Sequence, residues 1–467
     1  MQHNNHDKSF CVLLLAAGKG TRMHSRTPKV LQSLLEENLL YYPLAAVKEA
    51  GFEDVAVIVG YEGNQVQEWL LTEFPDVKAI WQKEQLGTGH AAKVAEDWWS
   101  CYDNVIILPG DTPLITAETL RMLARRHLEK GSKCSFLSFE IEDPDGYGRV
   151  IRDGLSVKIV EHKDATPEEL KCREVNSGMY VFDTKMLSSV IDQLQCCNSQ
   201  NEYYLPDALA LIDKAGAHTD AVKAGSSSEF LGVNDPVQLA GAASVLRARI
   251  IDKWMSCGVK CIDPSTVWIG PKVVLDEDVI IEPSVQMWGN TSVGRGSRIG
   301  SFSVIADSAI EENVTIIGSV RVRDSRVGKG ASVGPFVLLR DNTVLAENVV
   351  VGRFVEIKKS VISEGSKVPH LSYIGDAEIG KHTNIGAGTI TCNYDGKNKN
   401  RTKIGDNSFI GSDTMLVAPV VIGDDAVTAA GSVITKDVND GALGIGRARQ
   451  SNIEGWSSRR KNQKGGK

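Results

Sequence analysis

The sequence has no cysteine spacing typical of a metal or redox centre. Its nine cysteines form no CxxC pair and no Cys/His zinc pattern. Cys196 and Cys197 are adjacent in the chain, which places them poorly for a structural disulfide. The simplest interpretation is that the cysteines are free thiols in a reducing cytosol.

Long apolar runs and an excess of positive charge are also missing. No apolar run approaches the roughly 18 residues that span a bilayer, and the N-terminal segment MQHNNHDKSF is polar. The net charge of −7 provides no global basic field for nucleic acid. We therefore expect a cytoplasmic protein of 467 residues with small-molecule substrates, no nucleic-acid partner and no membrane insertion. A short basic tail, 441–467, is expected to be a solvated chain end.

The second half of the chain is organised by an apolar side chain that recurs every six residues. This period fits neither a helix nor a coiled coil, which repeat at about 3.6 and 3.5 residues. It predicts a prism of stacked coils, with one short strand per side and the apolar residue pointing inward. A valine-rich β-sandwich is the alternative, but sandwich strands do not keep one register so long. Three in-phase blocks carry the repeat: Ile269, Leu275, Ile281, Met287, Val293, Ile299, Ile305; Val327, Val333, Leu339, Leu345, Val351, Ile357; and Ile404, Ile410, Leu416, Ile422, Thr428, Ile434.

The first half begins with a buried parallel strand, 11–17, that runs into the turn Gly18-Lys19-Gly20-Thr21-Arg22. A glycine-rich turn at this place lets backbone N–H groups approach phosphates, and Arg22 and Lys29 add positive charge. The spacing matches neither GxGxxG nor a P-loop. Further strands are predicted over 55–59 and 105–108, as in an α/β domain.

Asp111 directly follows the strand 105–108, where α/β sheets bind ligands. Its carboxylate could hold Mg²⁺ together with the oxygen of Asn234, or it could cap the helix expected around 116–130. The loop 82–90 is rich in amide and hydroxyl groups that suit a nucleobase edge. Polar groups at 146–149, 161–163 and 176–178 are of the kind that bind sugar hydroxyls.

Two breaks interrupt the six-residue repeat. The first, between Ile305 and Val327, needs only an extra loop. The second, between Ile357 and Ile404, contains many polar residues and the insert 392–401, and insertions in repeat proteins often build binding sites. His370 alone would be a surface histidine, but its polar neighbours in this break favour a site.

Several stretches resemble known families. AAGKGTRM, followed by Pro28-Lys29, resembles the signature of sugar-phosphate nucleotidyltransferases, and the six-residue repeat resembles the left-handed parallel β-helix of hexapeptide-repeat acyltransferases. In this order, with EQLGTGHA, VEHKDAT, RFVEIKKS and HLSYIGDAEIG, they resemble the bacterial family that combines N-acetylglucosamine-1-phosphate uridyltransferase and glucosamine-1-phosphate N-acetyltransferase.

The resemblance implies a Rossmann-like α/β uridyltransferase domain over 1–235, a linker helix over 236–261 and a left-handed β-helix acetyltransferase domain over 262–440. It also implies Mg²⁺, UTP and acetyl-CoA, a homotrimer with acetyl-transfer sites at subunit junctions, and UDP-N-acetylglucosamine as a product for peptidoglycan and lipopolysaccharide synthesis.

Site residues follow from the same resemblance. In the first half it assigns Arg22 and Lys29 to catalysis, Asp111 and Asn234 to Mg²⁺, and the following residues to UTP or UDP-N-acetylglucosamine: Leu15, Ala16, Ala17, Gly18, Lys29, Gln82, Gly87, Thr88, Gly110, Asp111, Gly148, Glu161, Asn176 and Asn234. In the second half it assigns His370 as general base, Arg340, Lys358, Tyr373 and Asn384 to the amino-sugar phosphate, and Ala387, Asn393, Tyr394, Ser412, Ala430 and Arg447 to acetyl-CoA.

Three places depart from the family pattern: 36–40 replaces a GKPM-like turn, Pro109 precedes Gly110 where tyrosine is usual, and Asp341-Asn342 follows Arg340 in place of proline-glycine. The last departure puts an acid beside the arginine expected to bind phosphate. Two other functions stay open. A nucleotidyltransferase with a purely structural β-helix would lack the polar cluster at 358–401, and a non-catalytic scaffold would have no need for Arg22, Lys29, Asp111 and Asn234 together.

Overall fold

The computed structural model describes residues 9–153, 156–225 and 227–464. The chain forms two compact units, which divide between Arg247 and Ala248 within the helix α8 (Pro236–Ser256). Among the described residues, none of the helices combines the length and the apolar character needed to cross a membrane.

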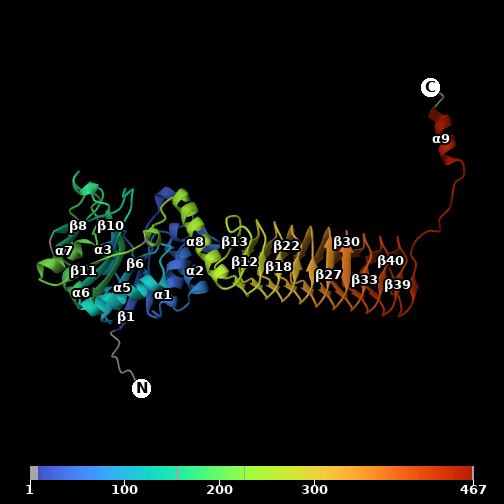
Figure 1. Ribbon diagram of the computed structural model, residues 1–467, viewed down its shortest axis with the longest axis horizontal. Coiled ribbons are helices and arrows are strands. Elements are labelled where there is room, and N and C mark those ends of the chain that lie inside the picture. Colours follow the sequence, from blue (N-terminus) through green and yellow to red (C-terminus); the bar gives the residue numbers. More distant parts are fainter. Residues whose placement is uncertain (1–8, 154–155, 226, 465–467) are drawn as a thin grey trace, which may run out of the picture. The chain divides into compact units, whose positions relative to one another are not determined.

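The first unit is a mixed sheet with helices on its faces (Figure 1). The strands follow the order β11-β7-β10-β6-β1-β4-β5, with the hairpin β8–β9 attached to β10. β1, β4, β5 and β6 run parallel, whereas β10 is antiparallel to both of its neighbours β6 and β7. The strands are β1 (Phe10–Leu15), β4 (Val55–Val59), β5 (Lys78–Trp81), β6 (Asn104–Pro109), β7 (Cys134–Glu140), β8 (Arg149–Asp153), β9 (Ser156–Val160), β10 (Glu174–Asp183) and β11 (Thr219–Lys223), with a separate pair β2 (Ser33–Leu34) and β3 (Glu37–Asn38).

Helices and short 3₁₀ turns connect these strands. They are η1 (Thr21–Met23), η2 (Lys29–Leu31), α1 (Tyr41–Glu49), α2 (Gly63–Glu73), α3 (Thr88–Lys93), α4 (Glu96–Trp99), α5 (Ala117–Lys130), η3 (Glu169–Lys171), α6 (Thr184–Ile191), α7 (Asp207–Lys214) and η4 (Ser228–Phe230). The central strands are buried on both faces, because Val12 and Leu14 join one apolar cluster while Cys11 and Leu13 join another. This explains why 11–17 is apolar without alternation.

The second unit is the parallel β-helix that the repeat predicts, with its strands stacked coil upon coil (Figure 1). All nineteen repeat positions are buried, including Thr428. Stacking puts equivalent residues in register, as in Ile281 beside Ile299 and Leu339 beside Ile357. The six-residue repeat therefore corresponds to one continuous core of inward-pointing side chains.

Three parallel sheets form the sides of the β-helix. Sheet C contains β12 (Lys260–Cys261), β15 (Ile280–Ile281), β18 (Arg298–Ile299), β21 (Thr315–Ile316), β24 (Ser332–Val333), β27 (Val350–Arg353), β30 (Lys367–His370), β33 (Asn384–Ile385), β36 (Phe409–Ile410), β39 (Val427–Thr428) and β41 (Leu443–Gly444). Sheet D contains β13 (Trp268–Ile269), β16 (Gln286–Trp288), β19 (Val304–Ala306), β22 (Val320–Arg323), β25 (Val337–Arg340), β28 (Val355–Lys358), β31 (Tyr373–Gly375), β34 (Ile390–Cys392), β37 (Met415–Val417) and β40 (Val433–Ile434). Sheet E contains β14 (Val274–Leu275), β17 (Ser292–Val293), β20 (Ala309–Ile310), β23 (Arg326–Val327), β26 (Val344–Leu345), β29 (Val361–Ile362), β32 (Ala377–Ile379), β35 (Thr402–Ile404) and β38 (Val420–Ile422). A final helix, α9, spans Trp456–Lys464.

The expected extra loop between Ile305 and Val327 is wrong. Ile310 pairs with both Val293 and Val327, and Val322 pairs with Ile305, so the coils continue without an insertion. The phase shifts because two corners lose one residue each, at Asp307 and Asp324, which adopt the left-handed conformation with φ of 46°. Asp and Asn tolerate this conformation better than most side chains, so a tight corner forms without glycine.

The second break does contain the predicted insert. Ile379 pairs with Ile404, although 25 positions separate them in sequence, because 393–401 leaves the coil before β35 begins.

Candidate functional sites

A cavity of about 370 Å³ opens at the carboxyl ends of β1 and β6 in the first unit. Most residues that the sequence assigns to nucleotide binding line it: Leu15, Ala16, Ala17, Gly18, Lys29, Gln82, Gly87, Thr88, Asp111, Glu161 and Asn176. The sheet brings these residues together, although they are spread over more than 150 positions of sequence.

The glycine turn brings Lys29 close to the end of β1. Gly20 has φ of 58°, and a Cβ there would lie 2.6 Å from Lys29 Cβ. Any larger residue would therefore strain the backbone and push Lys29 away.

Lys29 contacts two oxygen acceptors. Its Nζ donates to a carboxylate oxygen of Asp111 and, over 3.2 Å, to Oδ1 of Asn234. The two oxygens thus converge on one cation, and carboxylate and amide oxygens are donors that Mg²⁺ accepts. The alternative that Asp111 caps a helix is wrong, because Thr116 is the N-cap of α5 and its hydroxyl accepts from Thr119 N over 3.3 Å.

Four predicted residues of the first unit, Asn234, Gly148, Gly110 and Arg22, are not among those lining the cavity. Gly148 lies beside it, since a Cβ there would approach Glu161 Oε1 to 3.2 Å. Gly110 donates its N–H to the Leu15 carbonyl over 2.9 Å and holds the two strand ends together. Arg22 lies in η1 with an exposed side chain.

The loop 82–90 is held rigidly at the cavity. Gln82 is buried, and its amide donates to Gly87 O over 3.1 Å and lies 3.0 Å from His90 Nδ1. The Thr88 hydroxyl accepts from Leu205 N over 3.0 Å. Gly87 has φ of 102° and lies against Tyr203, so the segment 202–206 forms the opposite wall.

Tyr180 and Glu202 line the cavity but were missed by sequence reasoning. The Tyr180 hydroxyl accepts from Asn176 Nδ2 over 2.6 Å and thereby orients the amide of a predicted sugar contact. Burial raises the pKa of Glu161, and Asp207, Asp164 and Glu202 raise it further. The polar run Asn201-Glu202-Tyr203-Tyr204 before α7 was the available sequence signal.

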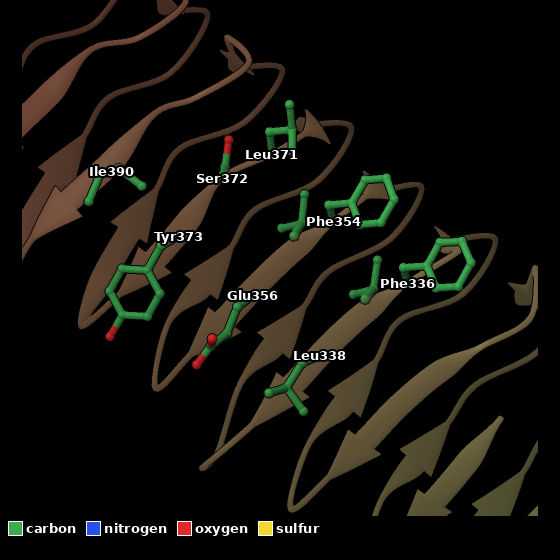
Figure 2. Close-up of a pocket in the computed structure, with 10 residues that line it drawn as sticks. Phe336, Leu338, Phe354, Glu356, Leu371, Ser372, Tyr373 and Ile390 are labelled. Atoms are coloured by element: carbon green, nitrogen blue, oxygen red, sulfur yellow. The ribbon is translucent and has the colours of Figure 1, made fainter.

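On the second unit, Arg340, Lys358 and Tyr373 lie on sheet D. Arg340 is in register with Lys358, and Glu356 is in register with Tyr373, one coil apart in each case. Figure 2 shows Leu338, Glu356 and Tyr373 in a row on this face. Arg340 Nε and Nη2 donate to Glu356 Oε1 over 2.9 and 2.8 Å, which fixes the plane of the guanidinium.

The insert 393–401 folds back on itself and closes one end of this face. Asp395 accepts from the N–H groups of Lys397 and Asn398 over 2.8 and 2.6 Å, and Tyr394 bridges to Lys399. Lys399, together with burial, lowers the pKa of Lys358. Two neighbouring ammonium groups form a position that favours an anion. Sequence reasoning missed Lys399.

The insert is also anchored at its base. Asn393 Nδ2 donates to Asp376 Oδ2 over 2.6 Å, and both side chains are buried. The side chain of Asn393, predicted to contact acetyl-CoA, therefore anchors the insert in this structure. The neighbouring Tyr394 is exposed.

The other acetyl-CoA candidates form a ladder along the corner between sheets C and D. Ala387 O accepts from Asp413 N, and Ser412 O accepts from Gly431 N, both over 2.7 Å. A Cβ on Gly411 would lie 2.6 Å from Ala430 N, and one on Gly431 would lie 4.0 Å from Arg447 Cδ. The four predicted residues thus stack coil upon coil.

His370 and Asn384 lie on sheet C, not on sheet D. His370 is exposed at the end of β30, and Asn384 pairs with Lys367 in the next coil. Near His370 a shallow groove of about 470 Å³ runs along the corner, lined by Phe336, Phe354, Leu371 and Tyr373 among others. Figure 2 shows the rings of Phe336 and Phe354 side by side, with centroids 5.2 Å apart.

Comparisons with known proteins cover both units of the chain. The family model for nucleotidyl transferases matches residues 11–254, the GMPPB C-terminal domain matches 261–352, and the bacterial transferase hexapeptide (six repeats) matches 401–436. The "Bifunctional protein GlmU" of Carboxydothermus hydrogenoformans is 48% identical over 95% of this chain and 99% of its own length. Those of Caldanaerobacter subterraneus subsp. tengcongensis and Heliobacterium modesticaldum are 48% and 47% identical, each over 96% of this chain and 97% or 98% of their own.

Identity at this level over nearly the full length confirms the resemblance and excludes the scaffold and the single-activity alternative. The chain belongs to the GlmU family of bifunctional enzymes, which joins the nucleotidyltransferase and the N-acetyltransferase of UDP-N-acetylglucosamine synthesis in one polypeptide.

Proposed function

We propose that the β-helix unit acetylates glucosamine-1-phosphate with acetyl-CoA, and that the cavity of the first unit joins the product to UMP from UTP. The observation that supports this best is the occurrence of two charged sites in one chain. Lys29 and Asp111 line the cavity, with Asn234 bonded to Lys29, and Arg340 and Lys358 lie on sheet D.

Uridylyl transfer is a direct displacement. A phosphate oxygen of N-acetylglucosamine-1-phosphate forms a bond to the α-phosphorus of UTP while the bond to pyrophosphate breaks. No enzyme nucleophile is required, so the residues position the substrates and neutralise charge. In our assignment Gly18 and Lys29 contact phosphates, with Arg22 reaching the same charge from η1.

The remaining cavity residues would bind the two ends of the nucleotide sugar, the uracil base and the sugar ring. Gln82, Gly87 and Thr88 face the uracil, while Asn176, Glu161 and Gly148 face the sugar. Asp111 and Asn234 would hold Mg²⁺, which when bound neutralises phosphate charge. Their convergence on the Lys29 ammonium supports this assignment, because a cation already fits there. No group of three or more His, Cys, Asp or Glu side chains suited to a metal occurs in the described part of the chain, so phosphate or water oxygens would complete the shell.

Acetyl transfer needs a neutral amine. The amine of glucosamine-1-phosphate attacks the thioester carbonyl, its proton passes to His370, and the C–S bond to coenzyme A breaks. Imidazole can accept a proton near neutral pH. Arg340, Lys358 and Tyr373 would hold the sugar phosphate with Asn384. The ladder of Ala387, Ser412, Ala430 and Arg447, with Tyr394 and Asn393, would hold acetyl-CoA.

A homotrimer would complete this second site. Within one chain the phosphate residues end the strands of sheet D, whereas His370 and Asn384 lie on sheet C. A neighbouring copy at the C–D corner could bring the two sets together. Phe336, Phe354 and Leu371 project from this corner with 54%, 57% and 61% of their surface exposed, which is costly unless a partner covers them.

We also place the enzyme in the cytoplasm, where UTP and acetyl-CoA are available. The nine free cysteines support a reducing compartment.

One assay tests the pair of reactions. The purified protein is incubated with glucosamine-1-phosphate, acetyl-CoA, UTP and Mg²⁺, and each component is then omitted in turn. We expect UDP-N-acetylglucosamine only in the complete mixture, and N-acetylglucosamine-1-phosphate when UTP alone is omitted. Formation of the nucleotide sugar without acetyl-CoA would contradict the order of the two steps.

A further inference from the structure

Asp341 lies in the middle of the cation cluster on the β-helix. Its Oδ2 accepts from Arg340 Nη1 over 2.7 Å and lies 4.0 Å from Lys358 Nζ. Its Oδ1 lies 3.5 Å from Arg323 Nη2. Three cations from three successive coils therefore surround one carboxylate.

The arrangement leaves Arg340 few free donors. Glu356 takes Nε and one N–H of Nη2, and Asp341 takes one N–H of Nη1. A guanidinium has five N–H donors, so two remain. A phosphate that binds Arg340 can use these two N–H groups, but it still competes with Asp341 for the positive charge of Arg340 and Lys358.

We propose that Asp341 is a specificity-determining residue of the amino-sugar-phosphate site: it is a resident anion that the sugar phosphate must displace. This rests on the proposed acetyl-transfer function of Arg340 and Lys358. A phosphate monoester carries nearly two negative charges near neutral pH and can displace one carboxylate from Arg340 and Lys358. A singly charged anion competes less well, so Asp341 makes the site selective for a doubly charged phosphate. Asp341 also weakens binding of the phosphorylated product.

Asp341 serves no evident need of the fold that would explain its charge. It occupies a corner in the left-handed conformation, with φ of 56°, and Asn342 beside it has φ of 62°. Asparagine adopts this conformation at least as readily as aspartate. The carboxylate therefore acts on its neighbours, and its charge can be removed without changing the corner.

The test is Asp341→Asn in the full-length enzyme. Exposed ion pairs contribute about 0.2–1 kcal/mol, so the KM for glucosamine-1-phosphate should fall by a factor of about 1.4 to 5. Inhibition of acetyl transfer by inorganic phosphate should strengthen by a similar factor. The KM for acetyl-CoA and the rate of uridylyl transfer should not change, because neither depends on Arg340.

Asp324→Asn is the matched control. Asp324 also follows an arginine at the equivalent corner one coil earlier, with φ of 46°, and its Oδ2 lies 3.2 Å from Arg323 Nε. Asp324 is not among the residues paired with Arg340 or Lys358. The KM of the Asp324→Asn enzyme for glucosamine-1-phosphate should therefore stay at the wild-type value.

The outcomes separate the inference from the function beneath it. An unchanged KM in Asp341→Asn would overturn the inference. A raised KM would also overturn it, since Asp341 would then be a positioning residue for Arg340. Arg340→Met must raise the KM for glucosamine-1-phosphate severalfold. If it does not, or if the wild type fails to acetylate this sugar, the proposed site is wrong regardless of Asp341.

Discussion

Lys29 shows how a single side chain can reveal a site before its ligands are present. Its ammonium touches Asp111 and Asn234, whose oxygens the sequence assigned to Mg²⁺. An ammonium and a metal cation cannot share the same oxygens at close range, because like charges repel. Binding of the metal would therefore displace Lys29 from Asp111 and leave it available to substrate phosphate.

The first prediction follows from this exchange. Asp111→Ala should abolish uridylyl transfer and leave acetyl transfer nearly intact, because it removes a charged oxygen ligand. Pyrophosphate release is measured across a magnesium titration. In addition, Mn²⁺ binding to the substrate-free protein should weaken in Asp111→Ala.

Lys29→Met provides the contrast. It should also lower uridylyl transfer, yet strengthen Mn²⁺ binding in the absence of substrates, since the competing ammonium is gone. Near-wild-type pyrophosphate release by Asp111→Ala at ordinary magnesium would refute the metal assignment.

The second prediction concerns His370. His370→Ala should lower kcat for acetyl transfer by about 10²–10⁴-fold, because it removes the proton acceptor for the sugar amine. The KM for glucosamine-1-phosphate should change much less than kcat, since proton transfer and not binding is lost.

Uridylyl transfer and the oligomeric state serve as internal controls on the same preparation of the His370 variant. Acetyl transfer within a few-fold of the wild type would make His370 an ordinary surface histidine.

At the residue scale, sequence reasoning found side chains that stand in recognisable stretches and missed those that do not. Lys29, Asp111 and Gln82 belong to such stretches, and the structure places them around one cavity. Tyr180 lies inside β10, where a buried tyrosine is usually part of the core, and Glu202 lies in a polar run whose composition does not indicate which site it joins. Their place in the cavity depends on tertiary packing, which no local spacing encodes.

At the scale of elements, the β-helix was the most predictable part. A repeat of six with nineteen inward positions leaves little freedom for another architecture, and all nineteen are buried. The first register break was misread as an insertion, because a loss of one residue at each of two corners changes the phase just as an added loop does. Distinguishing the two requires the conformations of Asp307 and Asp324, which the sequence alone does not determine.

Glycine at the corners gives a testable consequence of this packing. A Cβ on Gly300 would lie 2.5 Å from the backbone of Ile317 in the next coil, whereas one on Gly270 would lie 3.4 Å from the Trp288 ring. Both glycines directly follow a buried repeat position, Ile299 and Ile269. They therefore form a pair that differs in the space available.

We expect Gly300→Ala to destabilise the coils around it by about 1–3 kcal/mol, because the backbone cannot yield as a side chain can. Gly270→Ala should be neutral or stabilising by up to about 1 kcal/mol through reduced freedom of the unfolded chain. Hydrogen exchange of peptides covering 294–320 and 265–290 measures both locally. Equal protection of the amide hydrogens around the two substitutions would contradict this prediction, because it would show that the coils can move apart without loss of stability.

At the scale of the whole molecule, the two units carry chemically linked reactions on independent scaffolds. The residues assigned to uridylyl transfer all precede Pro236, and those assigned to acetyl transfer all lie between Arg340 and Arg447. Variants that remove one activity should therefore spare the other. The oligomer is the exception, since we propose that it completes only the acetyl-transfer site.

The last prediction tests that dependence. Phe354→Glu places a charge on the exposed corner where Phe354 stacks on Phe336, and burying it at an interface would be strongly unfavourable. The variant should dissociate the proposed trimer and lose acetyl transfer together, while uridylyl transfer persists. Val361→Glu, at an exposed position of β29 on sheet E, should remain trimeric and active in both reactions. Light scattering gives the mass and both assays are run on each fraction, so a monomer that still acetylates glucosamine-1-phosphate would show that one chain holds the complete site.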